Sequence, residues 1–204
     1  MPEDKYYFDR LFKKRKKFKF EVDEELLNLI LKNSKKSGNF LDLGVGESGI
    51  FLELARRNFN VDVLDISKTI TKEIKKISLR EKLKINVIAK DVRDFKFKGG
   101  YDIISCVALL HFLTKEEAYE LIKKMKEHTN ISGVNIIIAF REGDIGKSEE
   151  DSFYVRKSEL KSIYSNWNIL NYEDYEEEGR KFSFIIAKNL KNGRDNSGRL
   201  RSKS

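Results

Sequence analysis

The sequence contains few of the residues that build cross-links and metal centres. Its 204 residues include one cysteine, Cys106, and two histidines, His111 and His128. A single cysteine excludes an intramolecular disulfide framework and any Cys₄ or Cys₃His metal site. We therefore predict no metal centre, and we expect a reducing compartment, the cytoplasm.

Long hydrophobic runs are also missing. The longest nearly pure apolar stretch, Val134 to Phe140, is far shorter than the roughly 20 residues that a membrane-spanning helix needs. The first 20 residues contain no apolar segment of the kind that a secretory signal requires. We expect a soluble, unprocessed chain that does not enter a membrane and forms one α/β domain. The sequence does not indicate an oligomeric state.

The formal net charge of +8 is concentrated at the two ends of the chain. Residues 1–20 carry eight basic and three acidic side chains, residues 188–204 carry six and one, and residues 21–187 have an acidic excess of two. We therefore expect a basic N-terminal segment (1–20), a folded domain (21–188) and a basic, disordered tail (189–204). Such ends are usually solvated, but they can also bind RNA or another polyanion.

Short apolar runs alternate with helical patterns along the folded domain. This alternation predicts a single Rossmann-like, doubly wound α/β fold: a mostly parallel seven-stranded sheet with helices on both faces and an antiparallel closing strand. Thr114 and Glu117 have the spacing of a capping box, so a helix is expected to begin there. The expected strands are 39–43, 61–64, 85–89, 102–107, 134–139, 166–172 and 181–187, and the other expected helices are 21–35, 48–58, 67–79 and 157–164.

A glycine-rich turn follows the first expected strand. Gly44, Gly46 and Gly49 match the G-x-G-x-x-G fingerprint of nucleotide-binding turns. Glycine lets the chain turn sharply and lets a ligand approach the backbone, while the next helix presents free N–H groups to an anion. The fingerprint alone is weak evidence, because ordinary tight turns also produce it.

Two acidic residues at later strand ends strengthen the nucleotide hypothesis. Asp65 ends the second expected strand, where a carboxylate can accept hydrogen bonds from both hydroxyls of a ribose. Asp91 follows the third strand, where it can accept from the exocyclic amine of adenine. Either residue could instead cap a helix or face solvent. Together with the glycine turn, they favour a nucleoside ligand at the carboxyl edge of the sheet.

Asp42 distinguishes between the two common adenosine cofactors. It lies two residues before Gly44, where a carboxylate repels the diphosphate of NAD but attracts the ammonium group of S-adenosylmethionine. An NAD enzyme also needs a substrate domain, for which 204 residues leave little room. We predict S-adenosylmethionine as the cofactor, with S-adenosylhomocysteine as its product.

These motifs resemble those of class I S-adenosylmethionine-dependent methyltransferases over roughly residues 21–188. Residues 40–46, 63–66, 90–92 and 101–107 match the family's first motif, second motif, adenine motif and fourth strand. The segments 124–130, 133–139 and 158–164, together with Trp167, are similar to the tellurite-resistance methyltransferases.

The sequence departs from these families in two places. Ser48 occupies the usual third glycine position, and Gly49 is displaced by one. The stretch from Tyr172 to Arg180 is short, acidic and without the histidine that the tellurite-resistance enzymes carry there. The donor-binding residues expected from the motifs and the resemblance are Asp42, Gly44, Gly46, Ser48, Gly49, Asp65, Ile66, Asp91, Val92, Cys106 and Val107.

The resemblance implies methyl transfer to a small acceptor, and an anionic or chalcogen-containing acceptor is our first hypothesis. His111, after the fourth strand, is a candidate base or hydrogen-bonding group, and Arg141, after the fifth, is a candidate anion-binding group. A buried histidine and a solvated arginine are the alternative interpretations. Tyr6 and Tyr7 are candidates for a lid over the donor, or they anchor an amphipathic N-terminal segment.

Two other functions are compatible with the same fold. One is an RNA methyltransferase whose basic termini hold phosphates. The other is a non-catalytic nucleotide-binding module that kept the glycine turn without an acceptor site.

Overall fold

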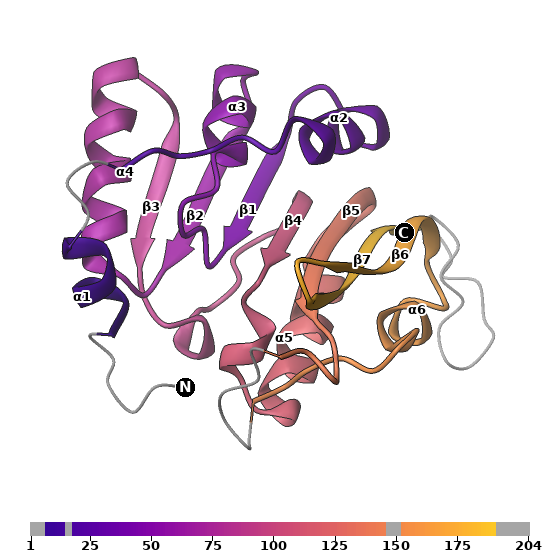
Figure 1. Cartoon of the computed structure of the whole chain (residues 1–204). Helices are drawn as coiled ribbons and strands as arrows, with labels where there is room; N and C mark the ends of the chain where they lie inside the picture. Colours follow the sequence, from indigo (N-terminus) through magenta and orange to yellow (C-terminus); the bar gives the residue numbers. More distant parts are fainter. Residues whose placement is uncertain (1–6, 15–17, 146–151, 191–204) are drawn as a thin grey trace.

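The computed structural model describes residues 7–14, 18–145 and 152–190. A seven-stranded sheet of order β3-β2-β1-β4-β5-β7-β6 forms its centre (Figure 1). Strands β1 to β5 run parallel, and β7 is antiparallel to both β5 and β6, which confirms the predicted topology. The strands are β1 (Asn39–Leu43), β2 (Asn60–Asp65), β3 (Ile85–Ala89), β4 (Tyr101–Val107), β5 (Thr129–Phe140), β6 (Asn168–Glu177) and β7 (Arg180–Lys188).

Helices cover both faces of the sheet. Consecutive residues of β1 point to opposite faces, so Phe40 packs with α2, α3 and α4, whereas Leu41 packs with α5 and α6. Both faces are therefore buried, as is usual for a parallel sheet. The helices are α1 (Tyr7–Lys13), α2 (Glu24–Asn33), α3 (Ile50–Arg56), α4 (Lys68–Glu81), α5 (Lys115–Glu127) and α6 (Glu159–Ile163), with short 3₁₀ helices η1 (Val92–Asp94) and η2 (Leu110–Phe112).

Side-chain caps begin α4 and α5, and the cap of α5 is the one that the sequence predicts. The Thr114 side chain accepts from the Glu117 backbone N–H, and the Glu117 side chain accepts from the Thr114 N–H, which completes a capping box at α5. Ser67 caps α4 by accepting from the Ile70 N–H at 3.3 Å. These caps satisfy N–H groups that have no partner inside the helix.

Several boundaries differ from the expected ones. Helix α3 begins at Ile50 with Gly49 as its N-cap residue, and the Gly49 N–H donates to the Glu21 carbonyl at 2.6 Å. Strands β6 and β7 form a longer hairpin that turns at Glu178 and Gly179, both of which have positive φ. The prediction of a disordered tail falls on residues that, apart from Asn189 and Leu190, lie outside the described part of the chain.

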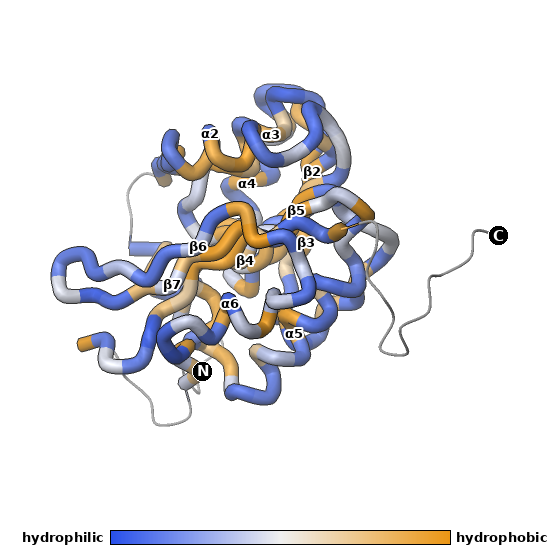
Figure 2. Tube along the Cα trace, turned by 90° about the vertical axis from the view of Figure 1, so that its right-hand side faces the viewer, coloured by the Kyte–Doolittle hydropathy of each residue, from blue (hydrophilic) through white to orange (hydrophobic). Residues whose placement is uncertain are grey.

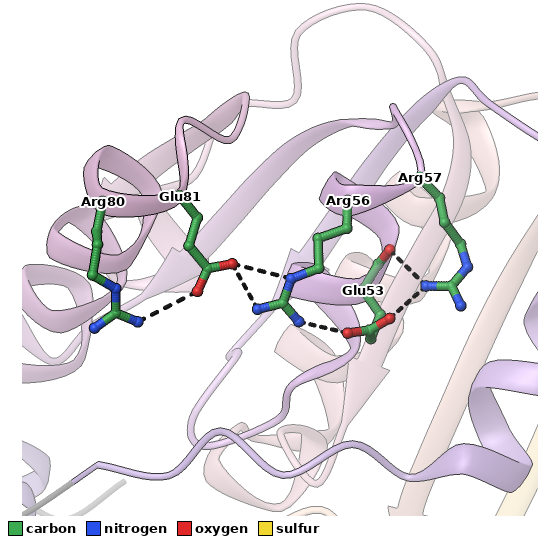
Figure 3. Close-up of polar contacts among 5 residues, drawn as sticks. All are labelled: Glu53, Arg56, Arg57, Arg80 and Glu81. Atoms are coloured by element: carbon green, nitrogen blue, oxygen red, sulfur yellow. Dashed lines mark hydrogen bonds and ion pairs between the residues drawn. The ribbon is translucent and has the colours of Figure 1, made fainter.

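Charged side chains join α3 to α4 near their C-terminal ends (Figure 3). Arg56 bridges the two helices, with its Nε 3.0 Å from the Glu81 carboxylate and a second ion pair to Glu53. Arg57 and Arg80 extend the network at its two ends. Exposed ion pairs typically contribute about 0–1 kcal/mol each, so the network supports the packing of these helices but does not determine it.

The open edge of the sheet at β6 is hydrophilic. Figure 2 shows hydrophilic residues along the outer part of the β6–β7 hairpin and hydrophobic residues at the centre of the sheet. Glu173, Glu176 and Glu177 are exposed on β6, where charge discourages pairing with another strand. No helix within the described ranges is long and apolar enough to cross a membrane.

Candidate functional site

A cavity of about 310 Å³ lies at the carboxyl ends of β1, β2 and β4. Because β1 lies between β2 and β4, this is the position where connections from neighbouring strands leave in opposite directions and where such sheets bind ligands. The structure brings together nine of the eleven predicted donor-binding residues in the lining: Asp42, Gly44, Gly46, Ser48, Asp65, Ile66, Asp91, Val92 and Val107.

Gly44 and Gly46, the first two glycines of the turn, have different roles. Gly44 and Gly46 both have left-handed backbones, with φ of 69° and 50°. A Cβ on Gly44 would lie 2.9 Å from a methyl group of Leu109, so Gly44 permits close packing. A Cβ on Gly46 would meet only the Gly44 carbonyl, at 3.9 Å. Gly46 therefore leaves space at the cavity for a ligand.

Asp65 holds the glycine turn against the end of β2. One carboxylate oxygen accepts from the Gly46 N–H at 2.9 Å, and the other accepts from the Ser67 N–H at 2.8 Å. Burial raises the pKa of Asp65, although these two N–H groups oppose the shift. Each oxygen has a further lone pair, so the carboxylate can still accept from a ribose.

Asp42 is buried in the wall of the cavity, with 4% of its surface exposed. Its carboxylate accepts from the Ser105 hydroxyl. Burial raises the pKa of Asp42 to about 7, with a smaller upward contribution from the charge of Asp65 and an opposing one from Ser105. A carboxyl group in this range ionises readily when a cation enters the cavity.

Asp91 both lines the cavity and caps a helix. Its carboxylate accepts from the backbone N–H and the Nε of Arg93, each at 2.9 Å, at the start of η1. Burial alone would raise the pKa of Asp91, but the Arg93 guanidinium and N–H group hold it below its ordinary value. Asp91 is thus ionised, and the capping role considered for it from the sequence is present in the structure.

Two predicted donor-binding residues lie outside the lining. A Cβ on Gly49 would be 2.9 Å from the Glu21 carbonyl oxygen, so this glycine permits close approach of the segment before α2. Cys106 is fully buried in the core on the α5 side of the sheet. Burial raises the pKa of the Cys106 thiol far above its ordinary value, which makes this thiol unreactive.

His111 and Arg141 lie at the same edge of the sheet but outside the cavity lining. The His111 ring contacts the rings of Phe112 and Phe140, with centroids 3.8 and 4.6 Å away. Burial, reinforced by the charge of Arg180, lowers the pKa of His111 to about 4, so the imidazole is neutral near pH 7. Among the described residues, the His111 Nδ1 and Arg141 Nε are the buried side-chain nitrogen or oxygen atoms that have no hydrogen-bond partner.

Helix α1 contributes cavity residues that the sequence analysis missed. Phe8 and Phe12 line the cavity, and Phe8 packs edge-on against Phe112 with centroids 5.0 Å apart. Tyr7, proposed as a lid residue, is 42% exposed, and Tyr6 lies outside the described residues. The signal that identifies the helix face is the four-residue spacing of the two phenylalanines.

Ala108, directly after β4, was also missed. It lines the cavity with a left-handed backbone, at φ 48°, and its N–H donates to the Ile138 carbonyl at 2.8 Å. Such conformations are unfavourable for alanine and cluster at functional sites. Within the described ranges, no group of three or more His, Cys, Asp or Glu side chains is placed to hold a metal ion.

The sheet order, the left-handed glycine turn and the carboxylates around the cavity are those of the class I S-adenosylmethionine-dependent methyltransferase fold. A family model described as "Tellurite resistance protein TehB" matches residues 5–183. The chain belongs to this family.

Curated relatives agree with this assignment. The chain is 30% identical over 135 residues to the "Probable S-adenosyl-L-methionine-dependent methyltransferase TehB" of Haemophilus influenzae, and the match covers 66% of this chain and 47% of the relative. A match of 29% identity to "Hemagglutinin 1" of Eikenella corrodens covers 45% of that protein. The chain therefore spans about half the length of these relatives.

Solved structures share the fold. The crystal structure of TehB from Haemophilus influenzae has a TM-score of 0.74 and 26% identity, covering 89% of this chain and 67% of that one. Magnesium protoporphyrin IX methyltransferase from Synechocystis with bound S-adenosylmethionine has a TM-score of 0.64 and 15% identity, covering 81% and 77%. The second likeness shows the fold alone.

Proposed function

We propose that this chain transfers the methyl group of S-adenosylmethionine to a small chalcogen oxyanion. The observation that carries the choice of acceptor is the pair of buried nitrogen atoms without partners, His111 Nδ1 and Arg141 Nε, after the neighbouring strands β4 and β5. Buried polar atoms are nearly always hydrogen-bonded, so two exceptions at one edge of a sheet favour a ligand there. The name of the family, tellurite resistance protein, supports the same class of acceptor.

The donor fits the residues around the cavity. Gly46 leaves its face of the turn open, Asp65 offers lone pairs to a ribose, and Asp42 offers a carboxylate to the ammonium group. Phe8 and Phe12 cover the cavity with apolar surface that excludes water. When bound, the donor supplies a methyl group activated by the sulfonium charge: a lone pair of the acceptor forms the new bond to carbon as the carbon–sulfur bond breaks, leaving S-adenosylhomocysteine.

The acceptor residues bind and orient rather than remove a proton. Arg141 Nε–H donates to an anionic oxygen, and the neutral His111 imidazole shares a second hydrogen bond with the acceptor. A histidine whose pKa is lowered to about 4 is a weak base, which suits an acceptor that arrives already deprotonated. Alignment alone provides effective molarities of about 10⁵ M or more.

A second cavity argues against the RNA alternative. A groove of about 420 Å³ between α2 and β6 carries Glu25, Glu173, Glu176 and Glu177, which repel phosphates. This groove would favour a cationic amine, which is therefore the competing small acceptor. The RNA alternative depends on the Lys13–Lys17 cluster and the basic C-terminal tail, of which residues 15–17 and 191–204 lie outside the described part of the chain.

The test is an acceptor panel with the purified chain. Selenite, tellurite, a small thiol and a small amine are each incubated with S-adenosylmethionine, and release of S-adenosylhomocysteine is measured. We expect turnover with the oxyanions, and Arg141→Ala should lower their kcat/KM by about 10- to 100-fold while leaving S-adenosylhomocysteine affinity unchanged. Arg57→Ala removes a surface arginine far from the cavity and serves as the matched control.

Three results separate the hypotheses. Turnover with the amine alone would replace the oxyanion hypothesis with that of a cationic acceptor. Tight binding of S-adenosylhomocysteine without turnover of any acceptor would favour the non-catalytic module. If Arg141→Ala methylates the oxyanions as efficiently as the wild type does, Arg141 is not part of the acceptor site.

A further inference from the structure

Asp9 lies on the inner face of α1, although an aspartate in an amphipathic helix normally faces solvent. Only 9% of its surface is exposed. One carboxylate oxygen accepts from the Ser67 hydroxyl at 2.7 Å and from the Thr69 backbone N–H at 2.9 Å. Figure 1 shows α1 beside the end of α4 at which these residues lie. Asp9 therefore attaches α1 to the first turn of α4.

Ser67 connects this attachment to the donor cavity. Its backbone N–H donates to one oxygen of Asp65 at 2.8 Å, and the other oxygen of Asp65 accepts from the Gly46 N–H at 2.9 Å. Asp9 is thus linked to the glycine turn by three hydrogen bonds in series, which the covalent frames of Ser67 and Asp65 connect. Of these residues, Asp65 and Gly46 line the cavity.

The same helix supplies the apolar cover of the cavity. Phe8 directly precedes Asp9, and Phe12 follows it by three residues. Both rings line the cavity, and Phe8 also packs against Phe112 of η2. An isolated helix of seven residues is not stable in water, so α1 keeps its position through such tertiary contacts.

Hydrogen-bond donors stabilise the charge of Asp9, although that charge also helps to raise the pKa of the nearby Asp65. Burial alone would raise the pKa of Asp9, but the Thr69 N–H and the Ser67 hydroxyl hold it below its ordinary value, so the carboxylate is ionised near pH 7. A negative charge at the N-terminus of the 14-residue helix α4 is also favoured by the helix dipole.

We propose that Asp9 is a positioning residue for donor binding: it holds α1 over the donor cavity and, through Ser67, keeps Asp65 oriented toward the ribose. Asp9 itself does not touch the donor. This inference rests on the proposed donor site.

The first test measures the dissociation constant of S-adenosylhomocysteine by calorimetry for the wild type, Asp9→Ala and Glu24→Gln. The control removes an exposed acid from the first turn of α2, outside every cavity described above. We expect Asp9→Ala to weaken binding about 10-fold and to raise the KM for the donor by the same factor, with kcat changed less than about twofold. Glu24→Gln should bind as the wild type does.

A double-mutant cycle with Ser67→Ala tests the route through Ser67. If Asp9 acts through that side chain, the two losses of affinity should be clearly less than additive. Fully additive losses, or an Asp9→Ala variant that binds as tightly as the wild type, would overturn the inference. A merely structural role would lower the unfolding temperature and leave the donor KM unchanged, which also overturns it.

Two failures, of folding and of donor binding, have separate consequences. If Asp9→Ala does not fold, hydrogen exchange of the wild type provides the result: S-adenosylhomocysteine should slow exchange in α1 more than in α6, and equal protection would refute the role of α1. If the wild type does not bind S-adenosylhomocysteine, the donor site itself is wrong, a failure distinct from that of Asp9.

Discussion

Replacing Asp65 with alanine tests the donor site most directly. Asp65 is 7% exposed at the end of β2, and its two oxygens accept from the Gly46 and Ser67 N–H groups. The substitution removes the acceptors that a ribose would use and the partner of the Gly46 N–H, while the Gly44 and Val45 N–H groups still donate to the Leu64 carbonyl of β2. Hydrogen bonds to a charged group contribute about 1.5–3 kcal/mol, so S-adenosylhomocysteine should bind about 10- to 100-fold more weakly.

Calorimetric titration with S-adenosylhomocysteine measures this loss, and Asp62→Asn is the matched control. Asp62 lies on the same strand but accepts from the Tyr101 hydroxyl at 2.8 Å, outside the lining of the donor cavity. Chemical denaturation of the same samples shows whether the variant is folded. An Asp65→Ala protein that is folded and retains wild-type affinity would refute the assignment of Asp65 to the ribose.

Three further predictions concern the cavity and the core. Because burial raises the pKa of Asp42 to about 7, protonation below that pH removes the charge that attracts the ammonium group. Affinity for S-adenosylhomocysteine should therefore fall by up to about tenfold per pH unit below pH 7, and Asp42→Asn should bind weakly without that dependence in calorimetry. Gly44→Ala places a methyl 2.9 Å from Leu109 on a left-handed backbone, so thermal unfolding should show destabilisation of about 1–3 kcal/mol. Tyr164→Phe removes the hydroxyl that accepts from the buried Asn135 amide at 2.9 Å, and urea unfolding should show a loss of about 1–3 kcal/mol; unchanged stability would contradict this account.

Local signals in the sequence predict much of the fold. The capping box of Thr114 and Glu117, the glycine turn and the apolar strands each depend on a few neighbouring residues, and the structure contains all three. The alternation of strands and helices leaves few topologies open, and the observed sheet is the one expected.

The contacts that were missed are formed between distant parts of the chain. The hydrogen bonds that Asp9 accepts from Ser67 and Thr69 span 58 and 60 residues, and no short pattern indicates them. The position of Gly49 against the Glu21 carbonyl is likewise tertiary, so its fingerprint spacing suggested a ligand contact that the lining does not include. Sequence spacing identifies which residues lie at the carboxyl edge of the sheet, whereas tertiary packing decides which of them line the cavity.

The burial of Cys106 affects the resistance of the chain to oxidation as well as its packing. Chalcogen oxyanions of the proposed kind oxidise accessible thiolates, and susceptibility to oxidation follows thiolate character and exposure. The one thiol of this chain is enclosed and remains protonated. We therefore expect that oxyanions of the proposed kind would not oxidise Cys106 in the folded chain.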